Sequence, residues 1–150
     1  MGEGPRPGRF EGKAHILPIR IYYEDTDLSG IVYHANYLRF MERGRSEFFR
    51  SAGITRLAML DDAEPTAWTL RKVALEYLRP ARIDDLIEVH TTLTGLSGAR
   101  MSADQKIYHE GQMLTRGTVE ACIITLSGKP RRIPEEFREK LAPLLLDTST

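Results

Sequence analysis

Residues 17–53, LPIRIYYEDTDLSGIVYHANYLRFMERGRSEFFRSAG, contain two hydrophobic periods, and the change from one to the other decides the fold. At the start, leucine and isoleucine alternate with Pro18 and Arg20, which is the period of two typical of a strand with one buried face. We expect this strand to end near Glu24. From Ala35 onward the apolar residues recur at helical spacing, which indicates an amphipathic helix. The stretch therefore predicts a strand, a loop and a long helix.

The predicted helix has an apolar face that would lie against a sheet. The members of this face are Tyr37, Phe40, Met41, Gly44 and Phe48, and charged residues occupy the opposite side. Gly53 is placed to end the helix, because glycine readily adopts the left-handed conformation just past a helix C-terminus.

Alternation returns after the helix. Apolar residues share one face in segments 73–77, 87–93, 101–107 and 113–123, each followed by turn residues, and Pro134 then opens a short terminal helix. Strands joined by short turns run antiparallel, so the predicted fold class is α+β, with an antiparallel sheet beside one long helix and a short C-terminal helix. The open edges of such a sheet invite pairing with a second chain, which predicts at least a dimer.

Length and composition indicate one domain. The chain has 150 residues, of which 41% are hydrophobic, and this suits a single domain over residues 14–150 with a sizeable core. Residues 1–13, MGEGPRPGRFEGK, are rich in glycine and proline, so we expect a loose, disordered tail and not a signal peptide. No apolar stretch approaches the roughly 20 residues of a membrane-spanning helix, so no membrane span is expected.

Charge and cysteine content exclude further classes of protein. The 21 basic and 21 acidic side chains give a formal net charge of zero, so the chain shows no broad electrostatic attraction for nucleic acid or an anionic membrane. Cys122 is the only cysteine, which excludes an internal disulfide framework and favours the cytoplasm. The histidines are scattered without short ligand spacing, so we expect no metal site.

The loop at residues 24–34 holds three acids in four positions, then a Ser-Gly break and a histidine. One interpretation is a turn with solvated charges, since these are common turn residues. The flanking tyrosines and aliphatic residues argue against it, because they predict a partly buried loop. A carboxylate buried there is costly, so it requires a structural partner or a function. A calcium loop of the EF-hand type is rejected, since its twelfth position is Asn36 instead of a bidentate glutamate and a strand precedes it.

Two further interpretations of this loop stay open. A helix that begins at about residue 34 or 35 directs free amide groups toward the loop, and its dipole favours negative charge there. A carbonyl between those amides and the carboxylate of Asp25 or Asp27 would form an acyl-transfer site, in which His34 helps to orient the carbonyl. In the alternative, His34 and the acids only cap and orient the helix, for which Asn36 and Ser29 are acceptable caps.

Three motifs carry a resemblance to a known family. They are YYEDTDLSGIVYHANY at residues 22–37, ERGRSE at 42–47 and RKVALEYLRPARIDD at 71–85. Together they resemble the hotdog-fold acyl-CoA thioesterases of the 4-hydroxybenzoyl-CoA thioesterase class, in particular the Tol-Pal-associated (YbgC-type) branch, over residues 16–134. The resemblance implies a hotdog fold, in which a five-stranded antiparallel sheet wraps around one long helix.

The resemblance also implies roles for residues of the loop. Asp27 aligns with the family's catalytic aspartate, which acts as nucleophile or as general base for water. His34 aligns with the helix N-terminal position whose backbone amide polarises the thioester carbonyl. Gly30, Val32 and Tyr33 would lie at the substrate, where Gly30 and Val32 shape the turn and bring the backbone close.

Family sites lie at a dimer interface, with the coenzyme A phosphates near basic side chains. The candidates in this chain are Arg71, Lys72, Arg100, Lys129, Arg131 and Arg132. Arg71, Lys72 and Arg131 are the expected substrate-binding residues among them.

By this resemblance we expect a cytoplasmic acyl-CoA thioesterase that releases free acid and coenzyme A. It would need no cofactor, because a thiolate with a conjugate-acid pKa of roughly 8.5 leaves with little help. The expected assembly is a homo-oligomer, a dimer or a homotetramer, with acyl carrier protein as a further partner. Two other functions stay open: a hotdog acyl-CoA dehydratase, and a non-catalytic module that binds acyl-CoA or acyl carrier protein.

Overall fold

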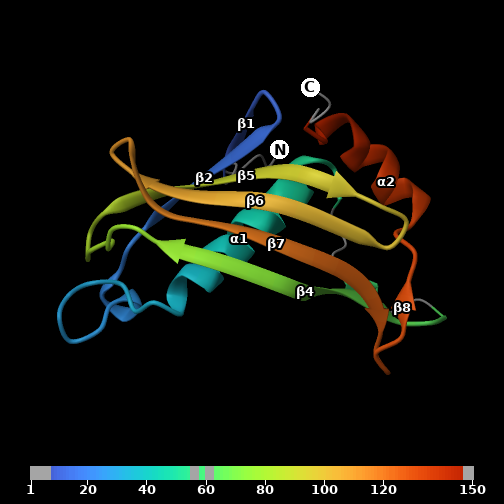
Figure 1. Ribbon diagram of the computed structural model, residues 1–150, viewed down its shortest axis with the longest axis horizontal. Coiled ribbons are helices and arrows are strands. Elements are labelled where there is room, and N and C mark those ends of the chain that lie inside the picture. The colour runs from blue at the N-terminus through green and yellow to red at the C-terminus, as the bar shows by residue number, and fades with distance from the viewer. Residues whose placement is uncertain (1–7, 55–57, 60–62, 147–150) are drawn as a thin grey trace, which may run out of the picture.

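A long helix, α1, lies against one face of a curved sheet (Figure 1). The computed structural model describes residues 8–54, 58–59 and 63–146. The strands are β1 (Arg9–Glu11), β2 (Ala14–Arg20), β3 (Ala58–Met59), β4 (Thr66–Tyr77), β5 (Leu86–Leu96), β6 (Arg100–His109), β7 (Gln112–Thr125) and β8 (Pro130–Arg131). The helices are α1 (Asn36–Ser51) and α2 (Glu135–Leu141), with short 3-10 turns at Tyr23–Asp25 and Ala142–Leu144. Neither α-helix among these residues is long and apolar enough to cross a membrane.

All strand pairs of the sheet are antiparallel. Its order is β1-β2-β5-β6-β7-β4-β3, and β8 pairs with β7. The long strands β2 and β4 to β7 are the five that the sequence predicts, and β1, β3 and β8 are short additions to them. The α+β class and the short C-terminal helix are therefore confirmed.

The apolar face of α1 forms the centre of the core. Its predicted members are all buried, and Phe49 joins them. Phe40 and Met41 are fully buried, and each contributes roughly 1.5–3 kcal/mol by burial. The first half of α1 packs in one cluster with β2 and β5, and its second half packs in another with α2. Helix α1 therefore connects the two ends of the core.

Gly53 ends the helix as predicted. Helix α1 stops at Ser51, and Gly53 has a φ of 95°, in the left-handed region where a residue with a Cβ is strained. The following residue, Ile54, is buried, and its amide donates back to the carbonyl of Phe49 at 2.9 Å. The glycine thus turns the chain so that an apolar residue returns to the core.

Three details differ from the sequence prediction. The first long strand ends at Arg20 and not near Glu24, because the chain enters a 3-10 turn in which the Asp25 carboxylate accepts the amide of Tyr22 at 2.8 Å. The expected loose tail is wrong for Arg9–Glu11, which pairs with β2; residues 1–7 lie outside the described part. In β7 an irregularity in the pairing with β6 leaves Met113 partly exposed and buries Leu114 instead.

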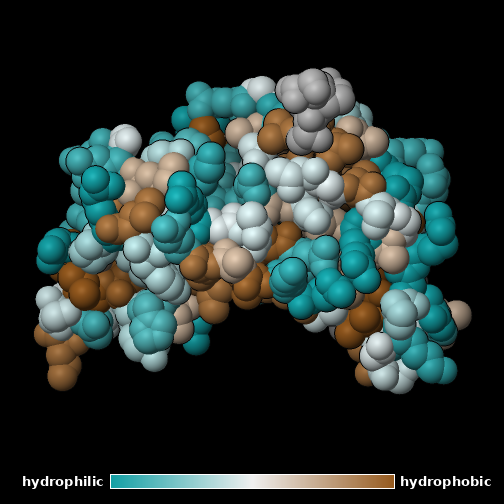
Figure 2. Space-filling model, viewed as in Figure 1, coloured by the Kyte–Doolittle hydropathy of each residue, from teal (hydrophilic) through white to brown (hydrophobic). Residues whose placement is uncertain are grey.

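Strand β4 lies near an edge of the sheet. The strand β3 pairs only with Thr66 and Ala67, so no other described strand covers the rest of the outer side of β4. Leu70, Val73 and Tyr77 on β4 are 41%, 41% and 47% exposed. Figure 2 shows that the surface is hollowed below the position of β4 in Figure 1, with hydrophobic residues gathered along the hollow.

Candidate active site

The loop between β2 and α1 folds back on itself around Gly30. The amide of Asp27 donates to the carbonyl of Ile31 at 2.9 Å, and the amide of Gly30 donates to the carbonyl of Asp27 at 3.1 Å. Gly30 has a φ of 81°, so another residue at this position would strain the turn. This turn fixes the backbone of Asp27 opposite Ile31.

The carboxylate of Asp27 is ionised and only half engaged. Its Oδ1 accepts hydrogen bonds from the amide of Ser29 at 2.8 Å and from the Ser29 hydroxyl. These bonds stabilise the charged form and hold the pKa of the Asp27 carboxyl below its ordinary value. Its Oδ2 has no hydrogen-bond partner among the described residues. The second oxygen is therefore free for chemistry at neutral pH.

The loop is partly buried, as expected, but Asp27 lies on its exposed part. Asp25, Thr26, Gly30 and Ile31 are half-buried and Val32 is buried, whereas the Asp27 side chain is open to solvent and Leu28 is 107% exposed. Within the described part of the chain nothing closes the site above Asp27, so exclusion of water there requires a second surface.

The start of α1 leaves amide groups open. Ala35 is the N-cap residue and provides no side-chain cap, and the first turn of the helix contains no acid. Within the described part of the chain, the amides of His34 and Ala35 have no hydrogen-bond acceptor. These two donors lie at the positive end of the helix dipole, which suits an oxyanion.

The interpretation in which the loop residues cap the helix is wrong. Asn36 uses its side-chain amide on the carbonyl of Asp25 at 2.8 Å, and Ser29 binds the Asp27 carboxylate instead of the helix. The loop is thus anchored to the first residue of α1, and the open amides at its start are preserved.

His34 is held at the helix start by its main chain. Its carbonyl accepts the hydroxyl of Tyr77 at 3.0 Å, and its exposed ring lies 4.5 Å from the ring of Tyr33. The Tyr77 ring also packs on Tyr37 of α1 at 5.3 Å. Tyr77, which comes from the far end of β4, was not among the residues predicted for the site.

The other predicted substrate-binding residues differ in accessibility. Tyr33 is exposed, whereas Val32 is buried in the core and its amide already donates to the carbonyl of Ala81 at 2.9 Å. Val32 therefore shapes the turn, and its side chain is not available to a ligand in this structure. Gly30 faces open space.

Of the basic candidates, Arg71 and Lys72 lie on β4 and Arg131 on β8, whereas Arg100 lies on β6 and Lys129 and Arg132 flank β8. Arg71 forms an ion pair with Glu120, and Arg131 binds Glu64 through two nitrogens at 2.6 and 2.8 Å. The ion pair between Arg131 and Glu64 lowers the pKa of the Glu64 carboxyl and raises the pKa of the Arg131 guanidinium. Lys72 has no ion-pair partner among the described residues. No contact joins these three cations to the Asp27 loop in the described part of the chain.

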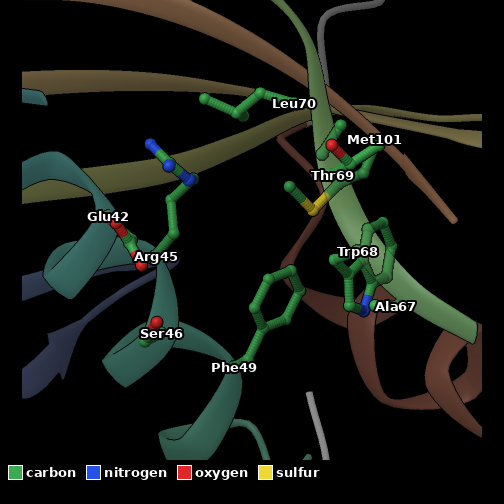
Figure 3. Close-up of a pocket in the computed structure, with 10 residues that line it drawn as sticks. Glu42, Arg45, Ser46, Phe49, Ala67, Trp68, Thr69, Leu70 and Met101 are labelled. Atoms are coloured by element: carbon green, nitrogen blue, oxygen red, sulfur yellow. The ribbon is translucent and has the colours of Figure 1, made fainter. Parts of the chain in front are cut away.

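A cavity of about 420 Å³ opens between α1 and the first half of β4 (Figure 3). Glu42, Arg45, Ser46 and Phe49 line it from α1. Their spacing of three and four residues places them on one helix face, a signal that the sequence contained. The opposite wall includes Trp68, and that pairing of α1 with β4 depends on long-range contacts that no local pattern predicts.

A metal is not suggested by the side chains. Among the described residues, no three His, Cys, Asp or Glu side chains come together to hold an ion. That no metal or cofactor takes part stays a prediction.

Comparison with known proteins identifies relatives over most of the chain. The acyl-CoA thioester hydrolase YbgC of Escherichia coli O6:H1 is 40% identical over 122 residues, covering 80% of this chain and 90% of the relative. The acyl-CoA thioesterase YbgC of Haemophilus influenzae is 37% identical, covering 81% and 90%. The crystal structure of a probable thioesterase from Bartonella henselae is 41% identical, with a TM-score of 0.76, covering 81% of this chain and 99% of that one.

A family model described as the Thioesterase-like superfamily matches residues 22–141. The predicted family resemblance, the hotdog fold and the enzyme class of thioester hydrolase are thereby confirmed. The chain belongs to the Thioesterase-like superfamily.

Proposed function

We propose that this chain hydrolyses acyl-CoA thioesters to a free acid and coenzyme A, with Asp27 and the open amides of His34 and Ala35 as the reacting site. The proposal is supported by two complementary groups, a carboxylate and a helix start, that lie on the same loop. An ionised carboxylate has one free oxygen, and an uncapped helix start offers two free donors. Relatives named acyl-CoA thioesterases support the substrate class.

The chemistry assigned to each group follows from its charge. The amides of His34 and Ala35 donate hydrogen bonds to the carbonyl oxygen of the thioester and stabilise the negative charge that develops on it. Asp27 Oδ2 attacks the carbonyl carbon, the C–S bond breaks, and the coenzyme A thiolate leaves with the electron pair. Water then hydrolyses the resulting anhydride and regenerates the carboxylate. The lowered pKa of Asp27 keeps its carboxyl ionised at neutral pH, as both direct attack and general-base activation of water require.

We further propose that the site is completed in an antiparallel dimer through β4. The uncovered outer side of β4 and its exposed Leu70 and Val73 support this interface. Two β4 strands paired about a two-fold axis bring the Tyr77 end of one strand beside the Thr66 end of the other. The Asp27 loop of one chain, which is joined to Tyr77 through His34, then lies over the cavity of its partner.

Assembly beyond the dimer, further partners and location are separate expectations. A tetramer, contact with acyl carrier protein, a link to the Tol-Pal system and a cytoplasmic location stay predictions of the family resemblance. Phosphate contacts by Lys72, and by Arg71 and Arg131 after release of their carboxylate partners, stay predictions as well.

The test is release of free thiol from a panel of acyl-CoAs by the wild-type chain and by Asp27→Asn. We expect turnover by the wild type and a loss of at least about a hundredfold in kcat for the variant. Tight acyl-CoA binding without turnover would instead identify a binding module, and hydration of an enoyl-CoA without thiol release would identify a dehydratase.

A further inference from the structure

The cavity between α1 and β4 has two chemically different sides. Phe49 from α1 and Trp68 from β4 stack at 5.4 Å and form an aromatic wall, and Figure 3 shows the Phe49 ring extending from α1 toward Trp68 on the opposite strand. Arg45 lines the same cavity, and in the figure its guanidinium extends from α1 toward the level of Leu70. A volume of about 420 Å³ suits a small organic group.

Arg45 is a partly buried cation with unused donors. Among the described residues, its guanidinium donates one hydrogen bond, from Nη1 to Oε1 of Gln105 at 2.9 Å. Gln105 is fully buried and is itself fixed by bonds to the Met41 carbonyl and the Thr91 hydroxyl, at 2.8 and 3.0 Å. A guanidinium carries five N–H donors, so this anchor orients Arg45 and leaves most of its donors free.

No carboxylate neutralises Arg45 within the described residues. Burial lowers the pKa of the guanidinium, and Glu42 opposes that shift from one helical turn away without an ion pair. Glu42 is exposed, so solvent screens its charge more than that of Arg45. An arginine stays protonated in proteins, so the cavity contains a positive charge that forms no ion pair with a carboxylate of the described residues, although the exposed Glu42 lines the same cavity.

Aromatic side chains pack beside the reacting loop. Tyr37 and Tyr77 pack together between the start of α1 and β4, and Phe40 next to Tyr37 is fully buried. An acyl chain that passed Tyr37 and Phe40 to reach its own chain's Arg45 would displace buried core side chains. In the proposed dimer, the loop of one chain instead faces the cavity of its partner.

We propose that this cavity receives the acyl group of a thioester held by the partner chain's loop, and that Arg45 binds a carboxylate at the far end of that group. The preferred substrates are then monothioesters of dicarboxylic acids. The inference rests on the proposed function and specifies its substrate class. The arginine fork matches a carboxylate in charge and geometry, whereas a methyl end would leave the cation without a partner.

The test compares three coenzyme A thioesters with six carbons in the acyl chain: adipoyl-CoA, 6-hydroxyhexanoyl-CoA and hexanoyl-CoA. We expect a kcat/KM at least about tenfold higher for adipoyl-CoA than for hexanoyl-CoA, as the gain of a charge-assisted hydrogen bond allows. Arg45→Met is expected to remove this preference and Arg45→Lys to retain part of it. Because the ratio is measured within one protein sample, partial unfolding of a variant does not change it.

Arg39→Met is the matched control, since it removes the same charge from an exposed position on α1 that does not line the cavity. It should leave the ratio unchanged. An adipoyl preference that survives Arg45→Met, or that Arg39→Met removes equally, would overturn the inference, as would a wild-type preference for the hydroxyl-ended or methyl-ended thioester. If the coenzyme A thioesters are still hydrolysed, each of these outcomes contradicts the role of Arg45 but not the proposed thioesterase function.

Binding is measured separately from turnover. Trp68 is the only tryptophan of the chain and lines the cavity, so its fluorescence reports occupancy. Titration with non-hydrolysable thioether analogues of adipoyl-CoA and hexanoyl-CoA should show tighter binding of the adipoyl form, and Arg45→Met should abolish the difference. Equal affinities in the wild type would contradict the role of Arg45, even if no thioester were hydrolysed.

Discussion

Replacement of Gly44 by alanine tests how closely α1 lies against the sheet. A Cβ at this position would lie 2.6 Å from Cγ1 of Val89, 3.1 Å from Nε2 of Gln105 and 3.2 Å from Oγ1 of Thr91. All three neighbours are buried, and Val89 belongs to the central strand β5, so neither the helix nor the strand can move without disturbing the core.

Two effects of opposite sign decide the outcome. Alanine is favoured over glycine in a helix interior by about 1 kcal/mol. Overpacking of a well-packed core costs typically about 1–3 kcal/mol, and a contact of 2.6 Å with a buried methyl group belongs in the upper half of that range. We therefore expect Gly44→Ala to lower the free energy of unfolding by about 1–2 kcal/mol, against the propensity effect.

The measurement is urea unfolding at one fixed protein concentration, because association adds to apparent stability. The urea concentration at the midpoint of unfolding should fall for Gly44→Ala, and the m-value should stay the same. Val89→Ala provides the control, since it removes the methyl groups that the new Cβ would meet. In a double-mutant cycle, Gly44→Ala should cost about 1 kcal/mol less on the Val89→Ala background. A higher midpoint for Gly44→Ala alone would refute the close approach of α1 to β5.

Four further predictions concern the loop and the edge strand. Asp27→Ala should leave the far-UV circular dichroism spectrum and oligomeric state unchanged but lower kcat by orders of magnitude in the thiol-release assay; undiminished turnover would contradict its role. His34→Ala should reduce kcat much less, since its backbone amide remains, and a loss equal to that of Asp27→Ala would assign the chemistry to the side chain. Ser29 lowers the pKa of the Asp27 carboxyl, so kcat/KM should stay level as pH falls from 7 to about 5 and should decline only near or below the ordinary carboxyl pKa of about 4. Ser29→Ala should move this decline to higher pH. A pH profile that Ser29→Ala does not move would show that another group titrates. Val73→Lys should shift the chain from dimer to monomer in size-exclusion chromatography with multi-angle light scattering and lower activity, while Lys72→Ala, at the neighbouring position, should leave the dimer intact; a dimer that persists in Val73→Lys would exclude the β4 interface.

The parts of the fold that follow local periodicity were predictable. The apolar face of α1 and the long strands were confirmed because each depends on side chains within a few positions of one another. The end of β2 was not predictable, since the Asp25 carboxylate accepts the Tyr22 amide and stabilises a 3-10 turn where the alternating pattern of residues predicts strand. The same competition between side-chain and main-chain acceptors explains why Asn36 anchors the loop instead of capping the helix.

The parts of the site that depend on distant pairing could not be predicted. Arg71 is paired with Glu120 and Arg131 with Glu64, partners 49 and 67 residues away, which become neighbours only once the sheet register is set. The cavity has the same origin. Its α1 side is visible in the sequence as a face of one helix, but the position of Trp68 opposite Phe49 depends on the course of β4.

Energetics explain why α1 can begin without a cap. A missing side-chain cap costs about 0.5–2 kcal/mol of helix stability. Burial of Phe40 and Met41 alone offsets this, at roughly 1.5–3 kcal/mol each, and both lie within the first two turns of the helix. Packing thus holds the helix start in place without the amides of His34 and Ala35. Asn36 fixes the loop through its side chain instead of through those amides, so the donors remain open at the position where the proposed reaction develops negative charge.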